Sequence, residues 1–236
     1  MDNIFLFHKS PFHAFSIQHL LPILVVFIIG LISILWAKYK LNDAQRKKLL
    51  LYLSFIPVLG YFLTVICSTI EGSFSIQENL PFHVCRFVAL AAPFVIWKNN
   101  RYWLAVFYFW ILAGTLNANI TPDINYGFPS WDYFSYWMIH SFLIILPIFY
   151  IIIFKIRITF KDLINAYVMA NVFLLCSLIV NYLIGSNYMY TLAKPESGSL
   201  LDIMGPWPWY LVWTQFLALL LFLILYLPFL FVRKLK

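Results

Sequence analysis

Cys85 is the residue in this chain whose type and neighbours best suit covalent chemistry. Pro81 precedes it, and proline favours the first turn of a helix, so we expect Cys85 close to a helix N-terminus. The positive end of that helix and the adjacent Arg86 both favour the thiolate, which is the nucleophilic form of cysteine. Burial among apolar residues opposes ionisation, so the sequence leaves the charge state of Cys85 open.

Two histidines are candidates for the base that would serve Cys85. We expect His140 about two turns inside a later helix, at a depth similar to that of Cys85, where it would take the thiol proton and later protonate a leaving group. His83 is the second candidate, because two residues are roughly 200° apart around a helix and its side chain would face away unless the first turn is irregular. Three acidic residues are candidates to orient the imidazole: Glu78, Asp123 and Asp202.

Each of these residues also has a structural explanation. A cysteine in a membrane helix is more often a small packing residue than a nucleophile. A single histidine there is more often a hydrogen-bonded interior residue, and Arg86 would serve equally well as a clamp to Glu78 or Asp123. Cys67 and Cys176 lack comparable neighbours, and we expect both to pack.

Other kinds of site lack the necessary residues. Three histidines near the start of the chain could join Glu78 in a metal site, but their spacing fits no metal-ligand motif. They are His8, His13 and His19. No lysine lies in the middle of a predicted span, and the chain has no glycine-rich phosphate loop. We therefore predict no metal and no cofactor.

The composition predicts a membrane protein. Hydrophobic residues make up 63% of the chain and charged residues 11%, with a mean hydropathy of +0.86. The apolar runs approach the roughly 20 residues that one helical crossing needs, and they do not alternate as barrel strands do. We expect an all-α, polytopic protein in which residues 1–236 form one seven-helix transmembrane domain. The predicted helices lie near 17–37, 49–70, 81–97, 102–120, 133–154, 164–184 and 209–232.

Basic residues sort to one side of such a bundle. With seven helices, all but three of the 16 Lys and Arg residues fall on the same side, and the exceptions are Lys9, Arg86 and Lys194. The positive-inside rule then predicts an extracytoplasmic N-terminus and a cytoplasmic C-terminus in the cell membrane. The net charge of +7 follows from this topology, so we expect no nucleic-acid partner and see no sign of a soluble partner.

Polar residues gather on the opposite side. All five histidines fall in the outer half or outside, together with Asn117 and Asn181, and the inner half of the helices has few polar residues. Polar groups in hydrocarbon usually face the bundle interior. The pattern predicts a cavity that is open to the outer leaflet and closed below it, which suits chemistry on a lipid better than a through-pathway.

Several segments together resemble the YwaF-type bacterial integral membrane proteins, which are related to the eukaryotic transmembrane protein 164 family. The resemblance runs along nearly the whole chain, and the final segment is the most specific. The segments are Leu80-Pro-Phe-His-Val-Cys85, Gly114-Thr-Leu-Asn-Ala118, Thr121-Pro-Asp123, His140 with Pro147, Asn181, Gly185-Ser-Asn-Tyr-Met-Tyr190, Lys194-Pro195, Ser199-Leu-Leu-Asp202 and Gly205-Pro-Trp-Pro-Trp-Tyr210.

The resemblance implies a seven-helix protein and, from the eukaryotic branch, a cysteine-dependent acyltransferase that moves fatty acyl chains between phospholipids. Cys85 would be the nucleophile and His140 the base, with His83 second. Asn117 stands in its motif where a different amide or an apolar residue would be expected, and this departure bears on substrate detail.

The leading hypothesis is a lipid acyltransferase or acyl hydrolase acting on membrane phospholipid at the extracytoplasmic leaflet. Residues that would stabilise the oxyanion or the lipid phosphate are Arg86, Asn117 and Asn181. The alternative is a non-catalytic membrane binding or assembly protein, or a small transporter.

Overall fold

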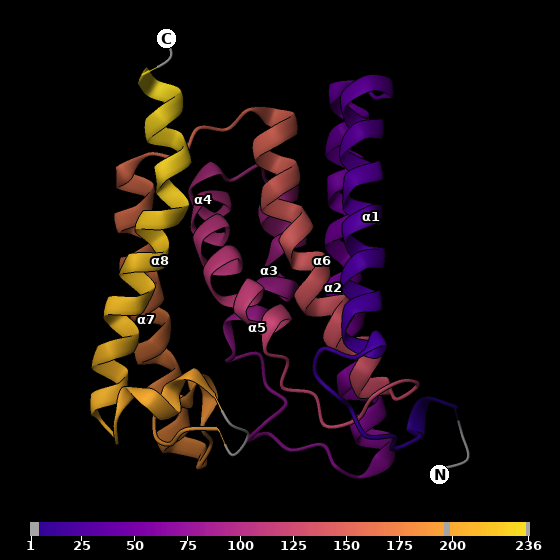
Figure 1. Ribbon diagram of the computed structural model, residues 1–236, viewed down its shortest axis with the longest axis vertical. Helices are drawn as coiled ribbons and strands as arrows, with labels where there is room; N and C mark the ends of the chain where they lie inside the picture. The colour runs from indigo at the N-terminus through magenta and orange to yellow at the C-terminus, as the bar shows by residue number, and fades with distance from the viewer. Residues whose placement is uncertain (1–4, 196–198, 235–236) are drawn as a thin grey trace.

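The computed structural model describes residues 5–195 and 199–234, and every regular element in that part of the chain is a helix. The helices lie side by side along the long axis, and the two termini lie at opposite ends of the bundle (Figure 1). The longer elements are α1 (Ile17–Lys40), α2 (Asp43–Glu71), α3 (Val84–Trp97), α4 (Arg101–Trp110), α6 (Trp131–Phe154), α7 (Phe160–Ile184) and α8 (Trp209–Lys234). The shorter ones are η1 (Phe5–Phe7), η2 (Ile111–Thr115), α5 (Leu116–Ile120), η3 (Tyr188–Tyr190) and η4 (Leu200–Met204).

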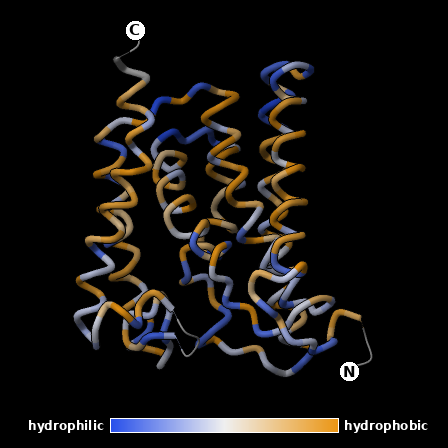
Figure 2. Tube along the Cα trace, in the orientation of Figure 1, coloured by the Kyte–Doolittle hydropathy of each residue, from blue (hydrophilic) through white to orange (hydrophobic). Residues whose placement is uncertain are grey.

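Six helical segments are long and apolar enough to cross a membrane, counting α4, η2 and α5 as the single run Arg101–Ile120. The helix α3 is apolar but shorter, with 14 residues. Hydrophobic residues dominate the long helices, and the connections at both ends are mostly hydrophilic (Figure 2). Large apolar side chains also face outward, as Phe27 and Phe216 do, which is expected of a surface solvated by lipid.

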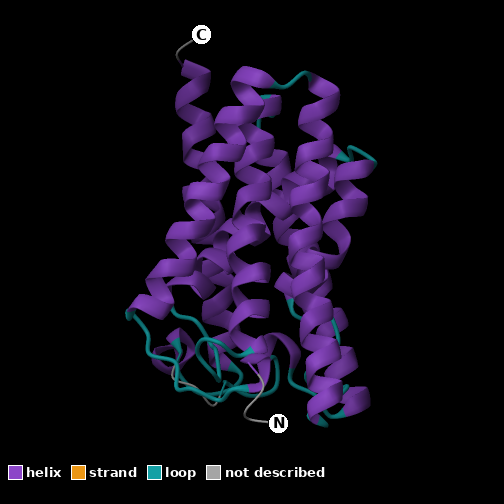
Figure 3. Cartoon of the chain, turned by 90° about the vertical axis from the view of Figure 1, so that its right-hand side faces the viewer, coloured by secondary structure: helices purple, strands orange, loops and turns teal. Residues whose placement is uncertain are grey.

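The connections at the two ends of the bundle differ in length. At the C-terminal end they are short, and the helices beside them begin with strong caps, such as the capping boxes of Asn42 with Gln45 and of Thr159 with Asp162. At the other end the connections are long and gather beneath the helices (Figure 3). One of these long connections joins α2 to α3 and leads directly to Cys85.

The start of α3 differs from the sequence prediction. The helix begins at Val84 rather than at 81, so Pro81 lies in the preceding connection and not in the first turn. The reason is tertiary: the Tyr61 hydroxyl donates to the Asn79 carbonyl, and the Leu80 N–H donates to the Tyr188 hydroxyl. These bonds and the bias of a residue before proline toward extended backbone keep the segment out of the helix.

The predicted helix near 102–120 is interrupted in the structure. Residues Ile111–Thr115 form a π-helical turn, in which hydrogen bonds run from i to i+5. Other helices differ from the prediction only at their ends, and the capping boxes explain why α2 and α7 begin earlier than predicted.

The two helices α2 and α6 pack closely at Gly60. A Cβ atom at this glycine would lie 2.9 Å from Met138 Cβ and 3.1 Å from the Ser135 carbonyl oxygen. Small residues allow such close approach of helix backbones in membranes. The approach fixes α6, which also carries His140, against α2.

Candidate active site around Cys85

Cys85 is the second residue of α3, one position from the end of the helix. The first helical hydrogen bond runs from the Phe87 N–H to the His83 carbonyl at 3.0 Å, so the N–H groups of the first three residues have no helical partner. The Cys85 Sγ lies 3.7 Å from Thr115 Oγ1, in the last position of the π-helical turn. The thiol therefore lies between a helix N-terminus and a hydroxyl, both of which stabilise negative charge on sulfur.

His140 lies on α6 with one ring nitrogen engaged. Its Nδ1 is 3.0 Å from the Tyr136 carbonyl, and its ring stacks on the Tyr136 ring with centroids 4.0 Å apart. A carbonyl only accepts hydrogen bonds, so in the neutral ring Nδ1 carries the proton and Nε2 carries the lone pair. Nε2 is thus the atom that can act as a base. No hydrogen bond joins His140 to Cys85 within the part of the chain that the structure describes.

The guanidinium group of Arg86 connects these residues electrostatically. Its Nη1 donates to the main-chain carbonyl of Glu78, rather than to the carboxylate that the clamp explanation considered. The charge of Arg86 acts on both the Cys85 thiol and the His140 imidazole. Both side chains therefore lie within electrostatic reach of one cation.

His83 is the N-cap of α3 and has extended backbone geometry, with φ −87° and ψ 138°. Its ring packs against Tyr188 and Tyr190, with centroids 5.3 and 5.7 Å away. Burial, followed by the charge of Arg86 and the neighbouring His140, lowers the pKa of His83 to about 3. His83 is therefore neutral at neutral pH and is a weaker base than a free imidazole.

The three acidic candidates lie in different surroundings. Asp123 accepts a hydrogen bond from the Tyr190 hydroxyl at 3.3 Å, and burial followed by this carboxylate raises the pKa of Tyr190 to about 12. Glu78 is exposed and reaches the site through its carbonyl. Asp202 caps the short helix η4 by accepting the Ser199 N–H at 2.7 Å. Asp123 thus lies beside the tyrosines of the site, while Asp202 organises the connection between α7 and α8.

The two predicted substrate amides are occupied within the protein. Asn181 is fully buried, and its amide makes four hydrogen bonds, to Ser186, Thr191 and both main-chain groups of Tyr188. Its capacity is fully used, and it holds the turn that carries Tyr188. Asn117 is exposed, and its Nδ2 donates to the Ala113 carbonyl of its own helix.

A buried polar network behind Thr115 was missed by the sequence reasoning. Asn119 Nδ2 donates to the Thr115 carbonyl at 2.8 Å, and Asn119 Oδ1 accepts from Ser141 at 2.6 Å. The Asn119 carbonyl is 2.8 Å from His19 Nε2, and His19 Nδ1 accepts the Phe15 N–H. The network ties α1, α5 and α6 together beside the thiol. The motif Gly114–Ala118 was a signal for Thr115, but nothing local marked its orientation.

The remaining histidines and cysteines form no metal-binding group among the described residues. Cys67 is buried, and Cys176 lies on the exposed face of α7.

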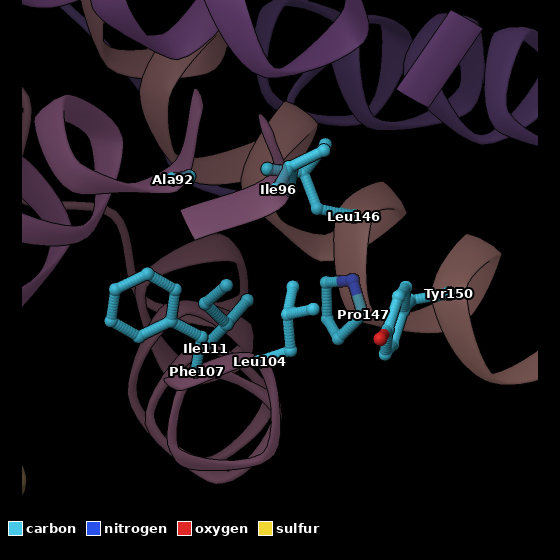
Figure 4. A pocket seen from close by; sticks show the side chains of 8 residues that line it. All are labelled: Ala92, Ile96, Leu104, Phe107, Ile111, Leu146, Pro147 and Tyr150. Atoms are coloured by element: carbon cyan, nitrogen blue, oxygen red, sulfur yellow. The ribbon is translucent and has the colours of Figure 1, made fainter. Parts of the chain in front are cut away.

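One small cavity lies deeper in the bundle, between α3, α4 and α6. It has a volume of about 10 Å³, which is room for one water at most, and its walls are apolar apart from the Tyr150 hydroxyl. Figure 4 shows Pro147 and Tyr150 of α6 facing Leu104 of α4 across this space. We regard it as a packing defect beside Pro147 and not as a binding site.

The chain matches the model of the TMEM164 family over residues 14–226 and belongs to that family. The family and the apolar helices together define a multi-pass membrane protein. No curated protein and no solved structure matches the chain.

Proposed function

We propose that this protein is a multi-pass enzyme of the cell membrane that transfers or hydrolyses fatty acyl groups of phospholipids through a cysteine thioester. The observation that carries the proposal is the position of Cys85 in the first turn of α3, within reach of Arg86 and with the free Nε2 of His140 on the neighbouring α6. The resemblance described above implies the same chemistry.

The proposed reaction has two halves. His140 Nε2 takes the proton of the Cys85 thiol, and the sulfur attacks the ester carbonyl carbon of a phospholipid. The unpaired N–H groups at the start of α3 and the guanidinium of Arg86 stabilise the oxyanion. Collapse forms the thioester and expels the lysophospholipid alkoxide, which takes the proton from His140. A second lipid hydroxyl or water then loses its proton to His140 and attacks the thioester. Collapse releases the acyl product and the Cys85 thiolate, which takes the proton back from His140.

We further propose that the chain crosses the membrane seven times, with α3 as a crossing in addition to the six long helical segments. Termini at opposite ends of the bundle are consistent with an odd number of crossings (Figure 1). The short connections and the helix ends beside them, which hold Lys38, Arg46, Lys98 and Lys155, would face the cytoplasm. The long connections and Cys85 would then lie toward the extracytoplasmic leaflet, where the substrate lipids would enter.

The direct test is acyl transfer from lipid to protein. Purified protein would be incubated with a phosphatidylcholine whose acyl chain carries an alkyne, and the adduct would be detected after click labelling. We expect an adduct that hydroxylamine removes, as it removes thioesters. We expect the adduct to be absent in Cys85→Ala and to form at least tenfold more slowly in His140→Gln, since general-base catalysis contributes about 10²-fold or more.

The matched control is Cys67→Ala, which removes a buried thiol from α2 and should leave the adduct unchanged. Adding a lysophospholipid or water alone as acceptor separates a transferase from a hydrolase. If Cys85→Ala forms the adduct as well as the wild type does, the proposed chemistry is wrong and a non-catalytic role is favoured.

A further inference from the structure

A groove with a volume of about 410 Å³ lies between α3 and α4 and runs from the basic end of the bundle to Phe87 in the first turn of α3. This volume falls within the range of small-molecule sites. Its walls are apolar, and two polar residues, Lys98 and Asn100, line the end where α3 turns into α4. The apolar wall includes Phe87, Ala91, Phe94, Trp103 and Phe107.

The length of the groove suits a hydrocarbon chain. Its lining runs along α3 from Phe87 to Lys98, which is about 16 Å at 1.5 Å per residue. In a membrane, apolar walls of this length are filled by lipid tails. The deep end is closed by aromatic contacts, since the Phe87 ring lies 5.0 Å from Phe173 and 6.3 Å from Trp110.

The polar end of the groove presents donors without acidic partners. The Lys98 ammonium lies over the rings of Trp97 and Phe94, at 4.3 and 5.9 Å, and forms no ion pair with a described carboxylate. Asn100 Oδ1 accepts the Trp103 N–H, which leaves the Nδ2 group to donate. A cation and an amide donor above an apolar groove match an anionic phosphate attached to an acyl chain.

Arg101, close to Lys98 in the chain, differs from it in having an acidic partner. Arg101 is held by both oxygens of Asp162 and by the Arg157 carbonyl, so its charge is already satisfied. The α3–α4 turn also lies deeper than the upper ends of α1, α6 and α8 (Figure 1). The connection that holds Lys98 is thus set below the level at which these helices end, and a phosphate bound there would be drawn inward.

We propose that this groove is a phospholipid-binding site in the leaflet at the basic end of the bundle. One acyl chain lies between α3 and α4, and the phosphate rests on Lys98 and Asn100. The phosphate and the ester groups of this lipid would lie beside Lys98 and Asn100, at the opposite end of α3 from Cys85, so it is not the acyl donor of the proposed reaction. The groove is therefore a second lipid-binding site, distinct from the proposed active site.

The test uses the full-length protein in nanodiscs that contain phosphatidylglycerol with a diazirine near the end of one acyl chain. We expect crosslinks on α3 and α4 around Ala91 and Phe107. Lys98→Gln should weaken the labelling about fivefold, since one lysine near anionic lipid contributes about 1 kcal/mol. Ala91→Trp, which fills the groove, should abolish it. The matched control is Lys161→Gln, an exposed lysine at the same end of the bundle.

Two results would overturn the proposal: crosslinks that avoid α3 and α4, or equal labelling of the Lys98 and Lys161 variants. Lys98 is exposed, so its replacement tests the site without disturbing the core. Cys85→Ala should label normally. This result separates the groove from the acyl-transfer proposal, because either can fail while the other stands.

Discussion

The sulfur of Cys85 and the hydroxyl of Thr115 face each other at 3.7 Å, across the junction of α3 and the π-helical turn. Among the described residues, Thr115 is the side-chain hydrogen-bond partner of the Cys85 thiol. Thr115 is buried, so its hydroxyl is held in place rather than exchanging with water. The pair makes the π-helical turn part of the candidate active site.

Thr115→Val should slow alkylation of Cys85 by iodoacetamide about tenfold at constant pH, in a Cys67→Ser, Cys176→Ser background. The reason is that a hydrogen bond to a charged group contributes about 1.5–3 kcal/mol, and about 1.4 kcal/mol is tenfold in rate. Thr115→Ser keeps the hydroxyl and should react at the wild-type rate. Equal rates for the valine and serine variants would show that the hydroxyl does not assist the thiol.

The location of the site was predictable from the sequence to the level of helices. Apolar runs predicted the long helices, and the all-helical membrane architecture is confirmed. The start of α3 was predicted three residues too early, because Asn79 and Leu80 are held by tyrosines distant in sequence. No local pattern encodes such contacts.

The roles of individual polar residues were harder to predict. Asn181 was expected to bind substrate, yet it has four partners within the protein. Asn117 and Thr115 are two residues apart, and one is exposed while the other faces Cys85. The phase of the helix is set by the π-helical turn, and a prediction from regular periodicity cannot supply it.

Gly60→Ala should destabilise the bundle, because its methyl group would meet Met138 and the Ser135 carbonyl at about 3 Å. We expect a loss of about 1–3 kcal/mol and a clearly lower melting temperature in nanodiscs. Gly114→Ala is the matched control, since nothing lies within 4 Å of its added Cβ atom. A Gly60→Ala melting temperature no lower than that of Gly114→Ala would contradict the close packing of α2 and α6.

Asp162→Asn should cost about 2 kcal/mol of stability. Asp162 pairs with Arg101 across α4 and α7, and its side chain is only 6% exposed, so its loss leaves a cation poorly compensated. The half-exposed Arg101 keeps the cost below that of a fully buried pair. Asp43→Asn, which breaks a pair whose carboxylate is 82% exposed, should cost less than about 1 kcal/mol. Thermal unfolding of both variants would make the comparison.

Acid should destabilise the folded protein through His83. Its pKa of about 3 lies below the unfolded value of 6.5, so between these values the unfolded chain binds a proton that the folded chain does not. Stability is therefore full above about pH 6.5 and falls as the pH drops toward 3. At about pH 5 the loss attributable to His83 is on the order of 1–2 kcal/mol.

His83→Phe preserves the ring packing against Tyr188 and Tyr190 and removes the titrating group. The difference in melting temperature between neutral and acidic pH should shrink in this variant. It should remain unchanged in His8→Phe, which replaces an exposed histidine. An unchanged difference in both variants would rule out the contribution of His83.

The 14 residues of α3 have a consequence for the surrounding bilayer. A helix of this length spans about 21 Å, whereas a hydrocarbon core is about 30 Å thick. With α3 as the additional crossing proposed above, lipids that border it would have to shorten, tilt or sink to match its length, and their ester groups would be drawn inward toward both ends of the helix. For the proposed enzyme this predicts a dependence on membrane thickness: lipids with shorter chains would deliver their esters to Cys85 at lower energetic cost than lipids with longer ones.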